Sequence, residues 1–230
     1  MTIEDPRLAR TRDALIRAAT AALDERDPET LNITELVAAA GVSRPSFYQH
    51  FGDLPTLVHA AALTRMRSAF ESIATPDAIG DSWSTFAHLT VRELIAHFDH
   101  HSAFYLRAIS GPGGQHFAAS VIRFLSERLR TVSPLAAAIG ATPRPEERAD
   151  FLAAGVVWTI TSWLAVDTDD RADVDEMAHR VDLLLLSSAG QSPAQIDAIL
   201  ASSPSLTDHT TGPDDAADHS PLFPASKASE

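Results

Sequence analysis

The chain has 230 residues, of which 45% are hydrophobic, and a formal net charge of −13 at pH 7. This length allows one large domain or two modest ones, and the apolar content excludes a disordered protein. The absence of cysteine excludes disulfides, thiolate nucleophiles and cysteine-type zinc sites. No signal-like segment opens the sequence, and its longest uncharged apolar stretch (151–166) is shorter than the ~20 residues of a membrane helix, so we expect a soluble cytoplasmic protein.

The first predicted helix runs from Leu8 to about Asp24, behind a loose arm of residues 1–7. Its apolar side chains share one face: Leu15, Ala18, Ala19, Ala22 and Leu23. Arginines lie near its start and acidic residues near its end. We therefore expect this helix to pack behind the following segment and to lend Arg12 to a phosphate.

Residues 32–51 predict two short helices joined by a tight turn. On the first, apolar residues recur at helical spacing: Ile33, Leu36, Val37 and Ala40. Asn32 is a typical N-cap residue, with Glu35 three positions later as in a capping box. Gly41 is predicted to end this helix, because glycine readily adopts the left-handed conformation of a C-cap.

The second short helix is predicted to begin after Ser43, and Pro45 is tolerated in its first turn. Phe47 and Phe51 lie four residues apart and are expected to face inward. The outward side chains are Arg44, Ser46, Gln49 and His50, with Tyr48 at the edge. A short helix with this division is typical of one that enters the DNA major groove. An ordinary helical hairpin on a protein surface is the alternative.

Residues 8–67, and above all the segment AGVSRPSFYQHF at 40–51, resemble the DNA-binding domain of the tetracycline-repressor (TetR) family of bacterial transcription regulators. The resemblance covers about a quarter of the chain. It implies an all-α homodimer with a DNA-binding domain at 8–70 and a ligand-binding and dimerisation domain at 71–201. Residues 202–230 are rich in Ser, Thr, Asp, Pro and Ala with few large apolar groups, and this composition predicts a disordered acidic tail. The expected partners are a palindromic double-stranded DNA operator and a small apolar or aromatic effector. The interpretation includes no enzymatic activity, cofactor or metal.

Within that domain we assign roles by side-chain chemistry. Arg44 is the candidate for a guanine edge and Gln49 for adenine. Ser46 and His50 are candidates for base edges or phosphate, and Tyr48 and Thr34 for phosphate. The complete predicted DNA-binding set is Arg12, Thr34, Ser43, Arg44, Pro45, Ser46, Tyr48, Gln49 and His50.

Two features oppose this interpretation. The family usually has a lysine followed by an acidic residue directly after the turn at Gly52 and Asp53, whereas this chain has Leu54 and Pro55, so one phosphate contact is missing. Residues 1–60 also carry six arginines against nine acidic residues, although nucleic-acid binders are usually basic. We expect a local basic rim to hold phosphates, with weak non-specific binding and strong salt dependence. A ligand-binding protein without DNA function is therefore one alternative.

The rest of the chain predicts an all-helical body. Asp53 is expected to cap a long helix with an apolar face formed by Leu57, Ala61, Leu63, Met66 and Phe70. A hinge at 74–80 precedes predicted helices at 82–100, 101–110, 115–131, 146–166 and 173–188, with a short one at 193–201. The glycine-rich segment 111–114 is predicted to be a connector, because no strand precedes it and no Gly-Lys-Ser/Thr follows.

One cluster suggests catalysis instead. His97 and His101 are spaced as a helical metal-chelating pair, and Asp99 lies between them. A metal-dependent hydrolase using these three residues is the second alternative. Because the surrounding segment is predicted to be helical, a polar helix end or pocket lining is favoured.

Large aromatic residues are concentrated in the predicted body, and this pattern is typical of an enclosed apolar ligand cavity as well as of plain core. The ligand-pocket candidates are Trp83, Phe86, Phe98, His101, Phe104, Tyr105, Phe117 and Trp158. The helices at 146–166 and 173–188 are the most apolar, and in the resembled family the last two long helices pair with their copies. The dimer-interface candidates are Leu152, Val156, Trp163, Val181, Leu184 and Leu185. A monomer core is the alternative.

Overall fold

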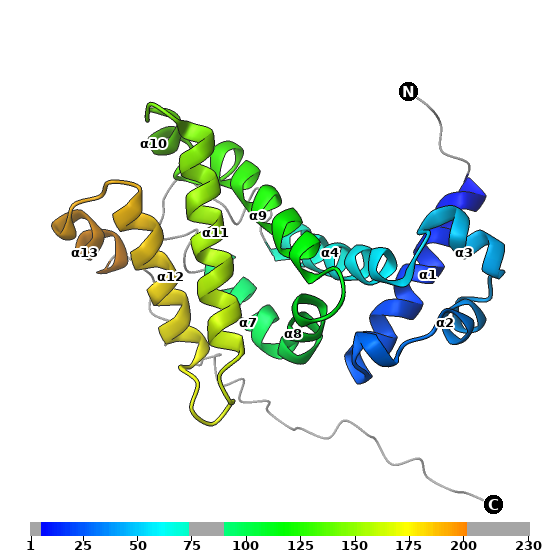
Figure 1. The fold of residues 1–230 in the computed structure, drawn as a ribbon. Coiled ribbons are helices and arrows are strands. Elements are labelled where there is room, and N and C mark those ends of the chain that lie inside the picture. The colour runs from blue at the N-terminus through cyan, green and yellow to red at the C-terminus, as the bar shows by residue number, and fades with distance from the viewer. Residues whose placement is uncertain (1–5, 74–89, 202–230) are drawn as a thin grey trace, which may run out of the picture.

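The computed structural model describes residues 6–73 and 90–201, and these ranges contain helices and turns without strands (Figure 1). The N-terminal helices lie at one end of the molecule, which we call the head, and the later helices form the body. The head contains α1 (Pro6–Glu25), the 3₁₀ turn η1 (Pro28–Thr30), α2 (Ile33–Ala40) and α3 (Arg44–His50). The long helix α4 (Leu54–Ile73) connects it to the body, which contains α7 (Arg92–His100), α8 (Ser102–Ser110), α9 (Gly114–Thr131), α10 (Ala136–Gly140), α11 (Pro145–Leu164), α12 (Val174–Ser188) and α13 (Pro193–Ala201).

The head forms through local signals and one small core. Asn32 accepts a hydrogen bond from the Glu35 amide at 2.9 Å, and Gly41 ends α2 in the left-handed region with φ 66°. Apolar side chains of α1 to α4 then meet in a buried cluster that includes Leu15, Ala19, Leu23, Leu36, Phe47 and Leu57. The predicted all-α fold and the helix-turn-helix of the head are confirmed.

Helix α4 belongs to both parts of the molecule. Asp53 caps it by accepting a hydrogen bond from the Thr56 amide at 2.8 Å. Leu57 and Ala61 in its first half are buried toward the head, where α4 packs on α1. Met66 and Phe70 in its second half are buried where α4 contacts α7, α8 and α9. One continuous helix therefore carries the single buried cluster from the head into the body.

The body is built around α9 and α11, which pack against each other along much of their length. Helix α12 lies beside α11 and also contacts α7, and α13 packs against α12 (Figure 1). Helices α11 and α12 thus lie on the side of the body away from the head, while α8 and α4 face it. No helix in ranges 6–73 and 90–201 is long and apolar enough to cross a membrane.

Some predicted segments begin or end differently, or lie outside the described residues. Helix α1 already begins at Pro6, inside the predicted arm, because proline is well suited to a first helical turn. The predicted helix 82–100 is described from Arg92 onward as α7, with Thr90 and Val91 leading into it. The hinge at 74–80, most of the arm and the tail at 202–230 lie outside the described residues, so the predicted domain boundaries stay predictions.

Candidate functional site

Helix α3 is held by aromatic side chains on one side only. Ser43 caps it by accepting a hydrogen bond from the Ser46 amide at 3.3 Å. Phe47 is fully buried and Phe51 nearly so, with ring centroids 6.3 Å apart. Because these two rings anchor α3 to the head, its opposite side faces away from the body (Figure 1).

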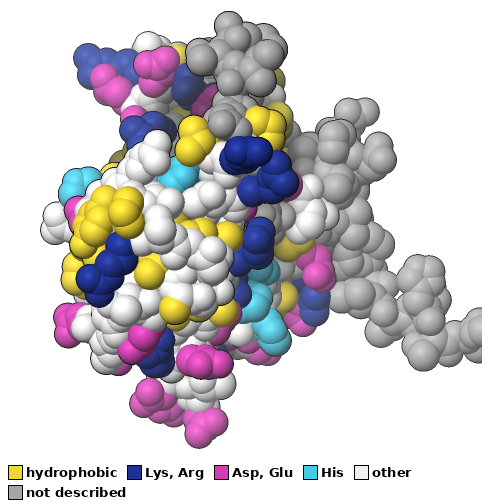
Figure 2. Space-filling model, turned by 90° about the vertical axis from the view of Figure 1, so that its right-hand side faces the viewer, with side chains coloured by type: hydrophobic (Ala, Val, Ile, Leu, Met, Phe, Trp, Pro, Cys, Tyr) yellow, Lys and Arg dark blue, Asp and Glu magenta, His cyan; other side chains and the backbone are white. Residues whose placement is uncertain are grey.

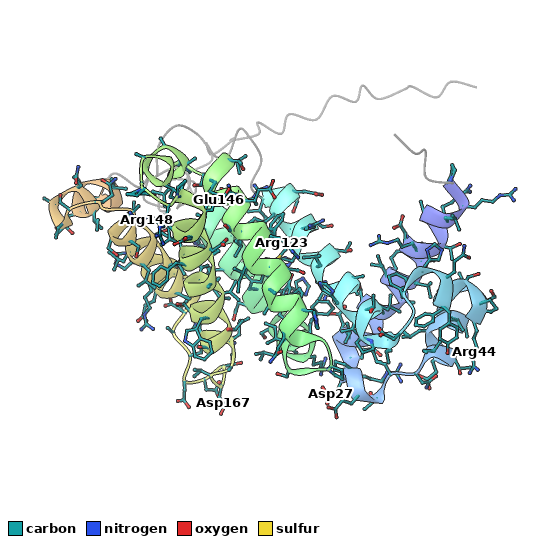
Figure 3. All side chains as sticks on the ribbon, turned by 45° about the horizontal axis from the view of Figure 1, so that its top comes forward. Asp27, Arg44, Arg123, Glu146, Arg148 and Asp167 are labelled. Carbon is teal, nitrogen blue, oxygen red and sulfur yellow. The ribbon has the colours of Figure 1, made fainter. Side chains whose placement is uncertain are left out.

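That opposite side carries the predicted base-reading residues. Arg44, Pro45 and Gln49 are exposed, and Tyr48 keeps 54% of its surface accessible. The Arg44 guanidinium donates a hydrogen bond to the Thr34 hydroxyl of α2, so two predicted contacts on neighbouring helices are joined. Arg44 lies at the end of the head farthest from the body (Figure 3). The outward side of α3 is therefore exposed, as a helix that enters a groove requires.

His50 and Arg12 are placed differently from the other candidates. His50 is half-buried beside Phe51, and its Nε2 atom is buried without a hydrogen-bond partner in the described part of the chain. The Nε2 atom of His50 is therefore not presented on the outward side, contrary to the expectation that the side chain points outward. Arg12 is exposed on α1, with its guanidinium carbon 5.9 Å from the centroid of the Phe51 ring. This position beside the end of α3 leaves it accessible to a phosphate.

Two acidic residues at and just after the end of α1 are paired with arginines of later helices. In Figure 2, which looks at the end of the molecule formed by the head, acidic side chains lie around the edges, while uncharged side chains and scattered basic ones occupy the centre. Asp24 binds Arg65 through two contacts of 2.5 and 2.8 Å, and Arg65 holds the pKa of this carboxyl below its usual value. Asp27 pairs with Arg107 at 3.1 Å. These two negative charges are thus partly neutralised by arginines of α4 and α8.

The body contains an apolar cavity of about 130 Å³. It is bounded by α4, α7, α8, α9, α11 and α12, and nearly all of its wall is aliphatic or aromatic. Its polar side chains are Thr90, Tyr105, Arg128, Ser133 and Thr161. An apolar cavity with a few polar groups is the usual form of a small-molecule site.

The predicted pocket residues divide into several groups. Phe98, Tyr105 and Phe117 line the cavity. Phe104 and His101 do not, and Phe104 is instead buried under the Arg65 guanidinium, 4.1 Å from its ring centroid. Trp158 is 74% exposed on α11, so its assignment to the pocket was wrong. Trp83 and Phe86 lie outside the described residues.

Sequence reasoning missed the aliphatic wall and the two polar residues Thr90 and Arg128. The search for aromatic residues overlooked Val121, Leu125 and Leu129, which recur at helical spacing on α9 and face the cavity. Their helical spacing was the signal in the sequence from which this part of the cavity wall could have been predicted.

The cluster of His97, Asp99 and His101 forms a polar junction. The His97 and His101 rings lie 4.7 Å apart, but His97 Nε2 hydrogen-bonds the Tyr105 hydroxyl at 2.9 Å and Asp99 pairs with the Arg171 guanidinium. Burial lowers the pKa of His97 to about 4, so its ring is neutral at pH 7. Within the described ranges no three His, Cys, Asp or Glu side chains are grouped as metal ligands. His97 and Asp99 are therefore engaged in polar contacts within the chain. The carboxylate that the hydrolase alternative would use as a metal ligand is already paired with Arg171.

The dimer-interface candidates require a correction. Four of them are buried within their own chain: Leu152, Trp163, Val181 and Leu185. Val156 is half-buried and lines the cavity, and only Leu184 in this set is exposed, at 49%. The large apolar residues that α11 and α12 expose are Phe151, Trp158, Leu183 and Leu184. The sequence pattern therefore selected mostly the side of α11 and α12 that packs inward, and the interface itself stays a prediction.

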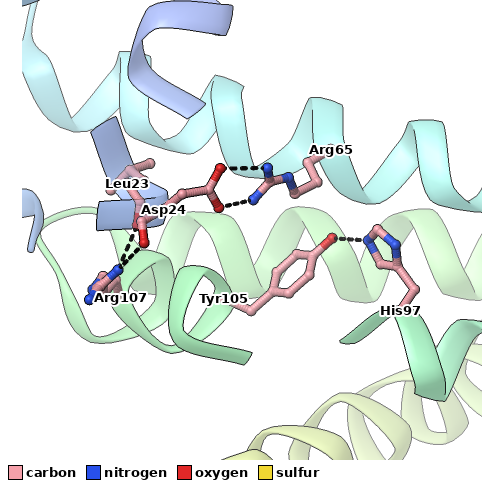
Figure 4. A network of polar contacts seen from close by, with 6 residues as sticks. All are labelled: Leu23, Asp24, Arg65, His97, Tyr105 and Arg107. Carbon is pink, nitrogen blue, oxygen red and sulfur yellow. Dashed lines mark hydrogen bonds and ion pairs between the residues drawn. The ribbon is translucent and has the colours of Figure 1, made fainter. Parts of the chain in front are cut away.

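Helix α8 contacts both the cavity and the head, and Figure 4 shows the polar contacts of its residues Tyr105 and Arg107. Tyr105 and Ile109 line the cavity. Between them along the chain, Arg107 donates hydrogen bonds to the backbone carbonyls of Leu23 and Asp24 in α1, at 2.9 and 2.8 Å. One short helix thus contacts the cavity on one side and the end of α1 on the other.

The loop after α8 also reaches the head. A side chain at Gly111 would lie 2.8 Å from Pro28, and one at Gly113 would lie 3.4 Å from Pro55. Gly113 also has a positive φ of 88°, which disfavours other residues. The glycine-rich connector is therefore required for close packing against the head.

A family model described as bacterial regulatory proteins, tetR family, matches residues 15–61. This range covers most of α1, the whole helix-turn-helix and the first turns of α4. No curated protein matches the chain.

Solved structures share the fold of the chain. A tetR-family transcriptional regulator from Streptomyces coelicolor superposes with a TM-score of 0.53 at 18% identity, over 85% of this chain and 90% of that one. The TetR family repressor AlkX from Dietzia sp., implicated in biodegradation of n-alkanes, gives 0.52 at 19%, over 82% and 96%. A TetR-like transcriptional regulator from Rhodococcus sp. RHA1 gives 0.51 at 17%, over 82% and 100%. The N-terminal part of the chain is thus similar to the helix-turn-helix domain of tetR-family regulatory proteins, and the described residues share the all-helical fold of these solved structures.

Proposed function

We propose that the protein is an effector-responsive repressor that binds a palindromic operator as a homodimer. The observation that carries this proposal is the free outward side of α3, with Phe47 and Phe51 buried behind it. Arg44, Tyr48 and Gln49 project from that side at the end of the molecule away from the body. Side chains of these types read base edges or hold phosphates in a major groove.

Within this surface, Arg44 is the proposed reader of guanine. A guanidinium can donate two hydrogen bonds to the O6 and N7 atoms of guanine, and such a contact discriminates by about 1–3 kcal/mol. Its hydrogen bond to Thr34 restrains the side chain before DNA arrives, which lowers the entropy lost on binding. Gln49, one turn further along α3, is the proposed reader of adenine.

A second copy of the chain is the proposed occupant of the exposed apolar face on α11 and α12. Phe151 and Trp158 are 75% and 74% exposed, and they lie seven residues apart, so they share one side of α11. Leu183 and Leu184 are further exposed apolar side chains, on α12, which packs against α11. Exposed rings of this size favour burial in an interface. Two subunits would supply the two heads that a palindromic site requires.

Effector response is proposed to pass through α8. A molecule in the cavity would contact Tyr105 and Ile109, while Arg107 on the same helix holds the end of α1. If the ligand binds more tightly to a state with α8 displaced, it shifts the heads out of register with DNA. The change in operator affinity then equals the difference in ligand affinity between the two states.

The test begins with selection of bound fragments from random duplex DNA by the full chain. Affinity for the selected duplex is then measured by fluorescence anisotropy at two salt concentrations. Arg44→Ala should weaken binding by about 5- to 150-fold per half-site, the equivalent of 1–3 kcal/mol, and relax the preference at one base position. Arg123→Ala is the matched control, because Arg123 is exposed on α9 in the body, far from Arg44 (Figure 3).

Both variants should keep the wild-type dimerisation and helical content. Selection of no common sequence by the wild-type chain would refute the proposed function. Equal affinities of Arg44→Ala and Arg123→Ala for the selected duplex would remove Arg44 from the contact surface.

A further inference from the structure

Three of the polar side chains on the cavity wall already have hydrogen-bond partners within the chain. The Tyr105 hydroxyl is hydrogen-bonded to His97 Nε2 at 2.9 Å. The hydroxyls of Ser133 and Thr161 each donate to a backbone carbonyl one turn earlier, at 2.8 Å. These three groups therefore meet their hydrogen-bonding needs without a ligand.

The other two polar residues of the wall, Thr90 and Arg128, present carbon atoms to the cavity. The Thr90 Oγ1 atom is fully buried, so a molecule in the cavity cannot contact it. The half-buried Arg128 stacks on two rings, with its guanidinium carbon 5.4 Å from the centroid of Phe70 and 5.6 Å from that of Phe124. Among the described residues, the surface that faces the cavity is therefore almost entirely carbon.

A cavity with a carbon surface selects against polar ligands. A hydroxyl group that leaves water and finds no hydrogen-bond partner loses free energy, and a carboxylate loses far more. Water is disfavoured for the same reason, and an engineered apolar cavity of similar size stays dry. An empty cavity also costs stability, because the side chains around it lack contacts on one side. An apolar molecule of matching size would supply those contacts without losing any hydrogen bond.

We propose that the cavity binds a small uncharged hydrocarbon, held by dispersion contacts alone and without a hydrogen bond to the protein. An aromatic ring fits the wall best, because Phe98 and Phe117 can make edge-to-face contacts with it. This inference rests on the proposed function in taking the cavity as the effector site, and it adds the chemical class of the effector.

The cavity volume limits the size of the hydrocarbon. A volume of about 130 Å³ is close to that of an engineered apolar cavity of ~150 Å³ that binds benzene. A molecule of about six to eight carbon atoms therefore matches the space. From benzene through toluene to ethylbenzene, each added carbon should raise the affinity about fourfold until the cavity is filled.

The test uses the full chain and three probes that share one ring, namely toluene, phenol and benzoate, in sealed calorimetric titrations. At a pH of about 7.5 phenol is neutral and benzoate is charged, so the series separates polarity from charge. The wild type should bind toluene at least about tenfold more tightly than phenol, because the phenol hydroxyl would be buried without a partner. Benzoate should not bind measurably.

Variants of α9 locate the bound toluene. Val121 lines the cavity, and Val121→Phe places a ring in that space, so toluene affinity should fall by about tenfold or more. Ile122→Phe is the matched control, because Ile122 is the next residue, is also half-buried and does not line the cavity. Its toluene affinity should equal that of the wild type. Arg128→Met keeps the aliphatic stem and should change toluene affinity by less than about threefold.

The wild-type comparison of toluene, phenol and benzoate needs no substitution, so the inference can be tested even if Val121→Phe fails to fold. Circular dichroism checks the folding of each variant.

Binding of phenol or benzoate as tight as that of toluene would overturn the inference, and so would a wild type that binds no toluene. Equal toluene affinities of folded Val121→Phe and Ile122→Phe would place the bound molecule outside the cavity and overturn it as well. Operator anisotropy without any probe tests the proposed function separately. If toluene binding depends on Val121 but no operator is bound, the ligand class stands and the repressor function falls. If the operator is bound but toluene is not, the ligand class falls alone.

Discussion

Asp182 on α12 provides a quantitative test of the body's packing. Its side chain is buried, with 6% of the residue exposed, and its Oδ1 atom has no hydrogen-bond partner in the described part of the chain. Burial raises the pKa of this carboxyl from its ordinary value of 3.8 to about 7. Burial is the cause because removal from water disfavours the ionised form.

The sign of the effect on stability follows from proton binding. Between pH 3.8 and about 7 the unfolded chain has released this proton while the folded chain retains it. Since the folded state binds more protons, the free energy of unfolding falls as pH rises through this window. At about 1.36 kcal/mol per pH unit, a window of about three units corresponds to roughly 4 kcal/mol lost by pH 8.

Asp182→Asn removes this titration while nearly preserving the side-chain volume. The variant should match the wild type in stability near pH 4 and exceed it by roughly 4 kcal/mol at pH 8. Urea denaturation followed by circular dichroism, at one fixed protein concentration, measures the difference at each pH. Asp197→Asn on α13 is the control, because Asp197 is exposed. This control should show no such pH-dependent difference from the wild type.

A stability difference between Asp182→Asn and the wild type that stays constant from pH 4 to 8 would refute the reasoning. It would mean that the folded and unfolded chains release this proton at the same pH. A variant less stable than the wild type at pH 8 would show that the carboxylate has a favourable partner in the assembled protein.

Two further predictions concern the interface and the junction of head and body. Trp158→Arg, on the exposed face of α11, should yield folded monomers in sedimentation velocity. Trp163→Arg should instead unfold the body, because Trp163 is buried. A dimer that stays intact in Trp158→Arg would place the interface elsewhere. Arg107→Met should lower the free energy of unfolding by about 2 kcal/mol, since it removes charged hydrogen bonds to α1, and wild-type stability in thermal unfolding would contradict this.

The head was predictable because its signals are local. Asn32 and Ser43 bond amides only three residues away, and Gly41 ends α2 through its own backbone conformation. Phe47 and Phe51 repeat one turn apart, so a single helical period identified the buried side of α3. Each of these features depends on a few neighbouring residues, and no distant part of the chain competes with it.

The body was harder to predict because its helices are apolar on more than one side. On α11, Leu152 and Trp163 are buried while Phe151 and Trp158 are exposed. Helical spacing shows that both sets form stripes, but the choice between them depends on where α9 and α12 pack. Thr90 and Arg128 were equally hard to predict as cavity residues. They lie far apart in the sequence and come to line the same cavity only in the folded chain.

The acidity that opposed a DNA-binding role has a structural explanation in the head. Asp24 and Asp27 are held by Arg65 of α4 and Arg107 of α8, so their charges serve the junction with the body and are directed away from α3. The same helices supply cavity residues, namely Met66 and Phe70 from α4 and Tyr105 and Ile109 from α8. The ion pairs of Asp24 and Asp27 therefore link the head to α4 and α8, the helices that also line the cavity. In this arrangement a strongly acidic chain keeps α3 accessible, and under the proposed function the ion pairs of Asp24 and Asp27 are among the contacts through which an effector would move the head.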